Sequence, residues 1–172
     1  MRLHLLPKLD KVEKIIISRP VVESGNSIGF LPGLAKDKLQ PYTKPIYDIM
    51  GSCLSAEQLN KYVEDGKIET VPFGYMGGLN FYESFVILDE VQNCSYDQLV
   101  LALTRFARGS KMVLTGDLVQ SDLPINQRGG FSTIIEKLTN TQDIGTIKLT
   151  NADVIREKIV RVILEKLDDK KY

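Results

Sequence analysis

The sequence is poor in the residues that mark secreted, zinc-binding or membrane proteins. Its 172 residues include two cysteines, Cys53 and Cys94, and one histidine, His4. Two isolated cysteines form neither a disulfide framework nor the paired spacing of a zinc site. No run approaches the roughly 18 to 20 apolar residues of a membrane span, and residues 1–6 are too short for a signal peptide. These absences predict a cytoplasmic protein with reduced thiols and no membrane partner.

A net charge is also lacking. Lys and Arg total 22, as do Asp and Glu, so the field of the whole chain gives no reason to expect nucleic acid or membrane. A local basic patch could still exist, because net charge says nothing about distribution. With 43% hydrophobic and 26% charged residues, the composition is that of an ordinary globular protein. The length fits a single domain over residues 1–172.

Five short apolar runs are typical of buried strands. They are Lys14–Ser18, Lys67–Val71, Ser84–Leu88, Lys111–Thr115 and Gly145–Leu149. The third and fourth contain continuously apolar stretches, as expected of strands that are covered on both faces.

Helix-start signals fall between these runs. Capping boxes, in which a Ser side chain binds an orphan amide and a Gln reaches back, are present at Ser55–Gln58 and Ser95–Gln98. We expect the first helix to reach about Asp65. The second is expected to pass through Phe106 and to stop at Gly109.

Two more helices are predicted, one over about Phe131–Leu138 and one after Asn151. Pro41 and Pro45 divide the stretch Leu34–Met50 into short or kinked helices. Because strands and helices alternate, the sequence predicts βαβ units and an α/β fold with a mostly parallel sheet between helices.

Two acidic residues follow the third apolar run, where ligands of parallel sheets bind. Asp89 is placed to hold Mg²⁺, directly or through water, with phosphate oxygens completing the shell. Glu90 could orient or deprotonate an attacking water. Taken alone, two acids at a strand end fit a solvated turn equally well.

A second polar turn follows the fourth apolar run. Gly116 allows close backbone approach to a ligand. Thr115, Asp117 and Gln120 offer a hydroxyl, a carboxylate and an amide that could sense a terminal phosphate. An ordinary crossover through the connecting helix would put the two polar strand ends side by side.

The order and spacing of these two strand ends resemble motifs II and III of superfamily 1 helicase-like ATPases, in which motif II carries Walker B. Further segments are similar to the PhoH-like ATPase family. They are Ile17–Gly25, Ile28–Gly33, Pro41–Tyr42, Pro45–Asp48, Thr104–Arg105, Gly109–Met112 and Asp122–Pro124. The similarity covers about residues 14–165, which is nearly the whole chain.

The resemblance implies a RecA-like P-loop fold, a three-layer sandwich that hydrolyses ATP with Mg²⁺. It places Glu90 and Gln120 in catalysis, with Arg156 as first choice for a phosphate-sensing arginine. The other candidate cations are Arg19, Arg105 and Arg128. Asp89 is the implied metal ligand. The implied cofactor-binding residues are Asp89, Thr115, Asp117 and Gln92. RNA or single-stranded nucleic acid and further copies of the chain are the implied partners.

The phosphate-binding loop of such ATPases, Gly-x-x-x-x-Gly-Lys-Ser/Thr, does not occur in the 172 residues. The resemblance places it just upstream of the strand at Lys14, so we expect an N-terminal truncation relative to the family. Without those amides and that lysine, ATP should bind poorly to the chain alone. A fragment, a split protein completed by another chain, and a natural short form of the kind that compact phage genomes carry all stay open.

Two alternatives to an ATPase are also open. One is a non-hydrolysing module that keeps the fold to bind nucleic acid or protein. Gly77 and Leu79 stand where the family typically has arginines, so any contact of those arginines with phosphate or nucleic acid is absent. A metal-dependent nuclease would have to use carboxylates that converge on shared ions. Its candidate ligands are Asp89, Glu90, Asp117 and Asp122.

Overall fold

The computed structural model describes residues 12–20, 44–150, 153, 155 and 157–167. The chain divides into two compact units, Met1–Lys137 and Leu138–Tyr172. The first unit contains the sheet and the predicted strand ends.

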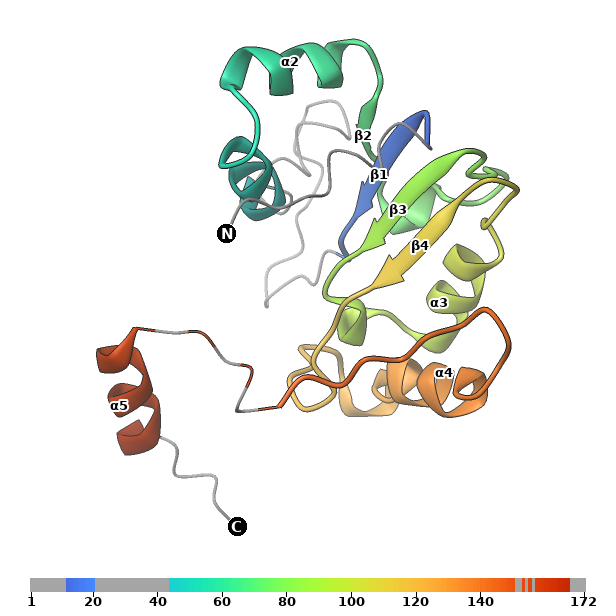
Figure 1. Ribbon diagram of the computed structural model, residues 1–172. Helices are drawn as coiled ribbons and strands as arrows, with labels where there is room; N and C mark the ends of the chain where they lie inside the picture. The colour runs from blue at the N-terminus through green and yellow to red at the C-terminus, as the bar shows by residue number, and fades with distance from the viewer. Residues whose placement is uncertain (1–11, 21–43, 151–152, 154, 156, 168–172) are drawn as a thin grey trace, which may run out of the picture. The chain divides into compact units, whose positions relative to one another are not determined.

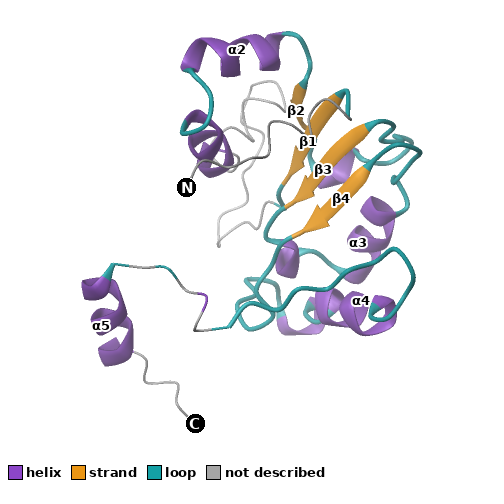
Figure 2. Cartoon of the chain, in the orientation of Figure 1, coloured by secondary structure: helices purple, strands orange, loops and turns teal. Residues whose placement is uncertain are grey.

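The first unit is built on a four-stranded sheet in which all neighbouring strands are parallel (Figure 1). In spatial order the strands are β2 (Ile68–Thr70), β1 (Lys14–Ser18), β3 (Ser84–Leu88) and β4 (Lys111–Leu114). Helices and short 3-10 turns connect the strands (Figure 2). This parallel sheet with its connecting helices confirms the α/β prediction and has the architecture of a RecA-like P-loop fold.

The helices begin where the capping boxes predict. Ser55 caps α2 and Ser95 caps α3, and in each case the Gln three residues on binds the cap backbone. The helices with given bounds in the first unit are α2 (Ala56–Glu64), α3 (Tyr96–Leu103) and α4 (Gly130–Leu138), of which the last reaches one residue into the second unit. Residues 44–51 are also helical. Between these helices lie the 3-10 turns η2 (Phe73–Tyr75), η3 (Val91–Asn93) and η4 (Ile125–Gln127).

Buried side chains lie on both faces of β1, where Ile16 and Ile17 are 2% and 0% exposed, and on one face of β3. Side chains on β3 alternate, so Val86 and Leu88 are fully buried while Phe85 and Ile87 are half-buried. From α3, Leu99 and Ala102 are buried, and Ile134 of α4 is nearly so. This packing fixes the position of β3 in the sheet, and with it the position of the acidic residues that follow the strand.

The predicted end of α3 is wrong. The helix ends at Leu103 with Thr104 as its C-cap, instead of continuing past Phe106 to Gly109. The backbone amide of Phe81 binds the carbonyl of Arg105, and Phe81 and Phe106 form an isolated parallel bridge. This pairing draws the chain out of the helix.

The fifth predicted strand is also wrong. Residues 145–149, in the second unit, have no regular secondary structure, and Ile147 and Leu149 are 87% and 75% exposed. A strand needs a neighbour to bind its backbone groups, and no strand pairs with this segment within the described ranges. The second unit does contain α5 (Lys158–Leu167), as expected after Asn151. None of the helices in the described part of the chain has the length and apolarity needed to cross a membrane.

Candidate functional site

The neighbouring strands β1, β3 and β4 end in register at one edge of the sheet, which brings the residues after them together. The register pairs Ser18 with Leu88 and Leu88 with Leu114. The ladder extends one residue further, because the amide of Asp89 binds the Ser18 carbonyl and that of Thr115 binds the Leu88 carbonyl, both at 2.9 Å. The carboxyl edge of the sheet therefore carries Arg19, Asp89 and Thr115 in adjacent positions.

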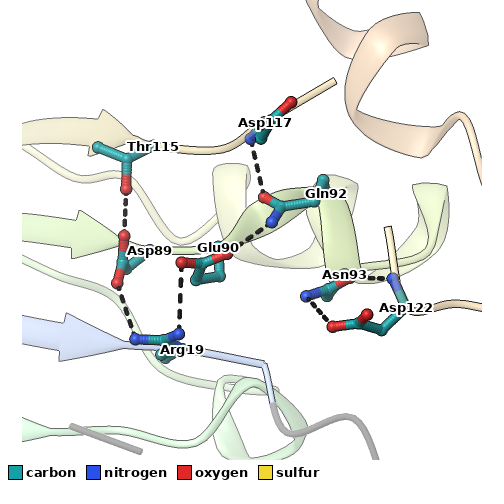
Figure 3. A network of polar contacts seen from close by, with 8 residues as sticks. All are labelled: Arg19, Asp89, Glu90, Gln92, Asn93, Thr115, Asp117 and Asp122. Carbon is teal, nitrogen blue, oxygen red and sulfur yellow. Dashed lines mark hydrogen bonds and ion pairs between the residues drawn. The ribbon is translucent and has the colours of Figure 1, made fainter. Parts of the chain in front are cut away.

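Asp89 lies between a hydroxyl and a guanidinium (Figure 3). Its Oδ1 accepts a hydrogen bond of 2.5 Å from Thr115 Oγ1, and its Oδ2 lies 3.5 Å from an Arg19 nitrogen. The other terminal nitrogen of Arg19 lies 3.3 Å from Glu90 Oε1. One guanidinium thus pairs with both adjacent carboxylates. These side chains are 25–38% exposed, so solvent screens the ion pairs and each contributes about 0–1 kcal/mol.

Glu90 has a left-handed backbone, with φ 54° and ψ 38°. A non-glycine residue in this region costs about 1–3 kcal/mol unless its surroundings hold it there. They do so here, because the Val91 amide binds the Thr115 carbonyl and the Asn93 amide binds the Glu90 carbonyl, both at 3.0 Å. The bend turns the chain from β3 into η3 and leaves the Glu90 side chain facing Arg19.

Gln92 joins the acidic strand end to the turn after β4 (Figure 3). Its Nε2 donates to Glu90 Oε2 at 2.6 Å, and its Oε1 accepts from the Asp117 amide at 3.1 Å. Gly116 lies close beneath this amide. A Cβ on Gly116 would lie 2.8 Å from Gln92 Oε1 and 2.9 Å from the ring of Phe131. The predicted close approach at Gly116 is therefore made to protein side chains.

The turn after β4 is attached to η3 a second time. The Ser121 hydroxyl donates to the Gln92 carbonyl at 2.9 Å. The Asp122 amide donates to Asn93 Oδ1 at 2.8 Å, and Asn93 Nδ2 lies 3.4 Å from the Asp122 carboxylate. The sequence alone indicates no role for Ser121 or Asn93, since their partners lie 29 residues away and no local spacing marks such pairs.

The structure brings together five of the predicted site residues but not all of them. Within the described residues, Asp89, Glu90, Gln92, Thr115 and Asp117 form one continuous network. Gln120 is exposed beyond the turn, and its side chain makes no hydrogen bond within that part of the chain. Arg156 lies outside the described residues.

The other candidate cations are engaged in local structure. Arg105 donates to the carbonyls of Leu101 and Leu79, and Arg128 to that of Leu123. Of the predicted cations in the described residues, Arg19 is the one paired with both site carboxylates.

The acids do not form a metal cage. No group of three or more His, Cys, Asp or Glu side chains that could hold an ion occurs in the described residues. Asp117 and Asp122 are engaged elsewhere, Asp117 accepting from the Val119 amide at 2.8 Å. This arrangement does not support the two-metal nuclease hypothesis. It fits Mg²⁺, which one or two carboxylates hold together with phosphate oxygens and water.

The parallel sheet and the acidic strand end define the class of protein as an α/β P-loop NTPase relative. The family model described as "PhoH-like protein" matches residues 3–168. The chain belongs to the PhoH-like protein family.

Curated relatives agree with this assignment. The PhoH-like protein of Bacillus subtilis (strain 168) is 42% identical over 157 residues, covering 91% of this chain and 49% of the relative. The PhoH-like protein of Mycobacterium tuberculosis (strain ATCC 25618 / H37Rv) is 39% identical over 155 residues, covering 90% and 44%. Protein PhoH of Escherichia coli (strain K12) is 35% identical over 150 residues, covering 86% and 42%. The chain spans about half the length of these relatives or somewhat less.

Proposed function

We propose that this chain supplies the metal-binding and water-activating half of an ATP hydrolysis site. The observation that carries the proposal is the cluster at the carboxyl edge, where Thr115 and Arg19 hold Asp89 and Arg19 also pairs with Glu90. Two carboxylates at the end of a central strand, next to a hydroxyl from the neighbouring strand, match what a magnesium–phosphate ligand requires.

Bound Mg²⁺ would neutralise charge on the β- and γ-phosphates of the nucleotide. Asp89 would hold the ion, directly or through water. Thr115 fixes the orientation of the Asp89 carboxylate through its 2.5 Å hydrogen bond, and Oδ2, which faces Arg19 at 3.5 Å, is the oxygen that would bind the ion or its water.

Glu90 would orient the attacking water and accept its proton. The left-handed backbone and the bond from Gln92 fix the direction of this carboxylate before any ligand arrives. Arg19 is the counter-ion of the Asp89 and Glu90 carboxylates, and its guanidinium would turn toward a phosphate that enters the site. Gln120 and Arg156 belong to the proposal as groups that contact the terminal phosphate.

The phosphates themselves need a loop of backbone amides and a lysine, which the 172 residues do not contain. We therefore propose that activity requires such a loop from outside these residues. RNA or another single-stranded nucleic acid as the partner, and assembly into a homo-oligomer, are part of the same proposal.

Steady-state ATP hydrolysis tests the proposal. It should be measured for the chain alone and for the chain joined to the region that precedes the match in the Bacillus subtilis relative. We expect activity only in the joined chain. In that chain Glu90→Gln should lower kcat by about 10²- to 10⁴-fold, whereas Glu136→Gln, an exposed charge-matched control on α4, should not. Full activity of the Glu90→Gln chain would refute the assigned role.

The same preparation decides between hydrolysis and the non-hydrolysing alternative. Binding of a labelled single-stranded RNA that is saturable, insensitive to ATP and unchanged by Asp89→Ala would favour a binding module. Nucleotide-dependent RNA binding that Asp89→Ala abolishes would support the ATPase.

A further inference from the structure

The Gln92 side chain bonds both to Glu90 at the acidic strand end and to the backbone of Asp117 in the turn after β4. We infer that Gln92 is a positioning residue, which transmits the placement of Glu90 to residues 115–122 and does not itself contact nucleotide. The inference rests on the proposed function for the role of Glu90, but the contacts that carry it require no ligand.

The two bonds of the Gln92 amide determine its orientation. The Asp117 backbone amide can only donate, so the Gln92 atom facing it must be Oε1, at 3.1 Å. Nε2 then faces Glu90 and donates to Oε2 at 2.6 Å. Because Nε2 has no acceptor capacity, Glu90 must present an unprotonated oxygen to it. The amide thus holds Glu90 as an acceptor and leaves Oε1 of Glu90 toward Arg19.

The surroundings of Gln92 allow it little movement. The residue is 7% exposed, and the Cβ that Gly116 lacks would lie 2.8 Å from its Oε1. Its own carbonyl accepts from Ser121 at 2.9 Å. The turn after β4 is therefore attached to Gln92 at Asp117 and again at Ser121.

The residues between those two attachments are free of the core. Leu118 and Val119 are 54% and 91% exposed, and Gln120 is exposed as well. A change in Glu90 that moves the Gln92 amide must shift Asp117, and the exposed tip moves with it. Because both polar groups of the Gln92 side chain are bonded within the protein and the residue is 7% exposed, little of the side chain is accessible to a nucleotide. This differs from its predicted place among the cofactor-binding residues.

A double-mutant cycle on the chain as it exists tests the coupling. The readout is hydrogen exchange of the Asp117 amide, with Leu88 amide exchange as the internal reference for the sheet. Gln92→Met keeps the length and removes both bonds, and Gln127→Met is the exposed control in η4. We expect Gln92→Met to raise Asp117 exchange at least tenfold relative to Leu88, and Gln127→Met to leave it unchanged.

The coupling itself appears in the second arm of the cycle. Glu90→Ala should raise Asp117 exchange when Gln92 is present and add nothing in the Gln92→Met background. Additive effects, or no effect of Gln92→Met, would overturn the inference. This result is independent of hydrolysis, so failure of the proposed ATPase function would be seen separately. In a joined chain that hydrolyses ATP, Gln92→Met should lower kcat at unchanged KM, whereas a raised KM at unchanged kcat would identify a nucleotide contact and contradict the positioning role.

Discussion

Thr115, at the end of β4, donates a 2.5 Å hydrogen bond to Oδ1 of Asp89, at the end of β3. The bond joins the two polar strand ends, 26 residues apart in sequence, across the parallel ladder. It orients a carboxylate that a flexible strand end would otherwise leave free to rotate.

Glycine usually lowers the stability of a protein relative to alanine. Because of the backbone strain at Glu90, we expect the opposite order at this position. Glu90→Ala and Glu90→Gly both remove the carboxylate, but only glycine adopts φ 54° without steric cost. We expect the Gly variant to have a free energy of unfolding about 1 kcal/mol higher than the Ala variant. Urea denaturation of both variants measures the difference. A less stable Gly variant would show that the left-handed conformation is not strained.

Close packing at Gly116 should make this position intolerant of even one methyl group. A Cβ there would lie 2.8 Å from Gln92 Oε1 and 2.9 Å from Phe131, so Gly116→Ala should destabilise the fold by about 1–3 kcal/mol. Gly77→Ala is the matched control, because nothing lies within 4 Å of its added Cβ. Thermal unfolding of the two variants compares them directly, and equal midpoints would contradict the packing.

The two thiols are expected to differ sharply in reactivity. Burial raises the pKa of Cys94 from 9.0 to about 12, whereas Cys53 is exposed. Since the thiolate is the reactive form, iodoacetamide should label Cys53 in the folded chain and Cys94 only after unfolding. Mass spectrometry of labelled peptides distinguishes the two sites. Equal labelling rates in the folded chain would contradict the burial.

The same burial makes stability depend on pH in alkaline solution. Cys94 loses its proton near pH 9 when unfolded but near pH 12 when folded. The contribution of the buried, protonated thiol to the free energy of unfolding is therefore complete below about pH 9 and is lost as the pH rises toward 12. Between about pH 8 and about pH 10 the loss should be about 1 kcal/mol. Comparison with Cys94→Ala removes the contributions of other titrating groups.

Arg19 should weaken the binding of a divalent cation that arrives without phosphate. It lies 3.5 and 3.3 Å from Asp89 and Glu90 and reduces the charge of the cluster. Removing one positive charge this close to the ion should raise Mn²⁺ affinity about tenfold. Mn²⁺ titration followed by electron paramagnetic resonance should show this gain for Arg19→Gln and not for the charge-conserving Arg19→Lys. A gain in both variants would assign the effect to geometry instead of charge.

Local sequence patterns were sufficient for much of the fold. β1 and β3 match their predicted ranges residue for residue, because short apolar runs between polar residues have few other ways to bury their side chains. The capping boxes at Ser55 and Ser95 fix the helix starts for the same local reason. The end of α3 depends on pairing between Phe81 and Phe106, which no local pattern reveals.

Some features of the candidate site could likewise be predicted from the sequence, and others could not. The strand ends at Asp89 and Thr115 could be predicted, since their order along the chain and the parallel sheet determine their proximity. The contact of Arg19 with both carboxylates crosses 70 residues of sequence, and Glu90 gives no sign of its left-handed backbone because glutamate rarely adopts it.

The most direct measurement is binding of Mn²⁺·ATP to the chain joined to the preceding region of the Bacillus subtilis relative, followed by electron paramagnetic resonance. If Asp89 holds the ion, Asp89→Asn should weaken Mn²⁺ binding in the presence of ATP by about tenfold or more. Glu90→Gln removes a nearby charge but no ligand and should weaken it less, whereas the control Glu136→Gln should bind as the unchanged chain does. Equal Mn²⁺·ATP affinity in the Asp89→Asn and unchanged chains would contradict the assignment of this strand end to the metal.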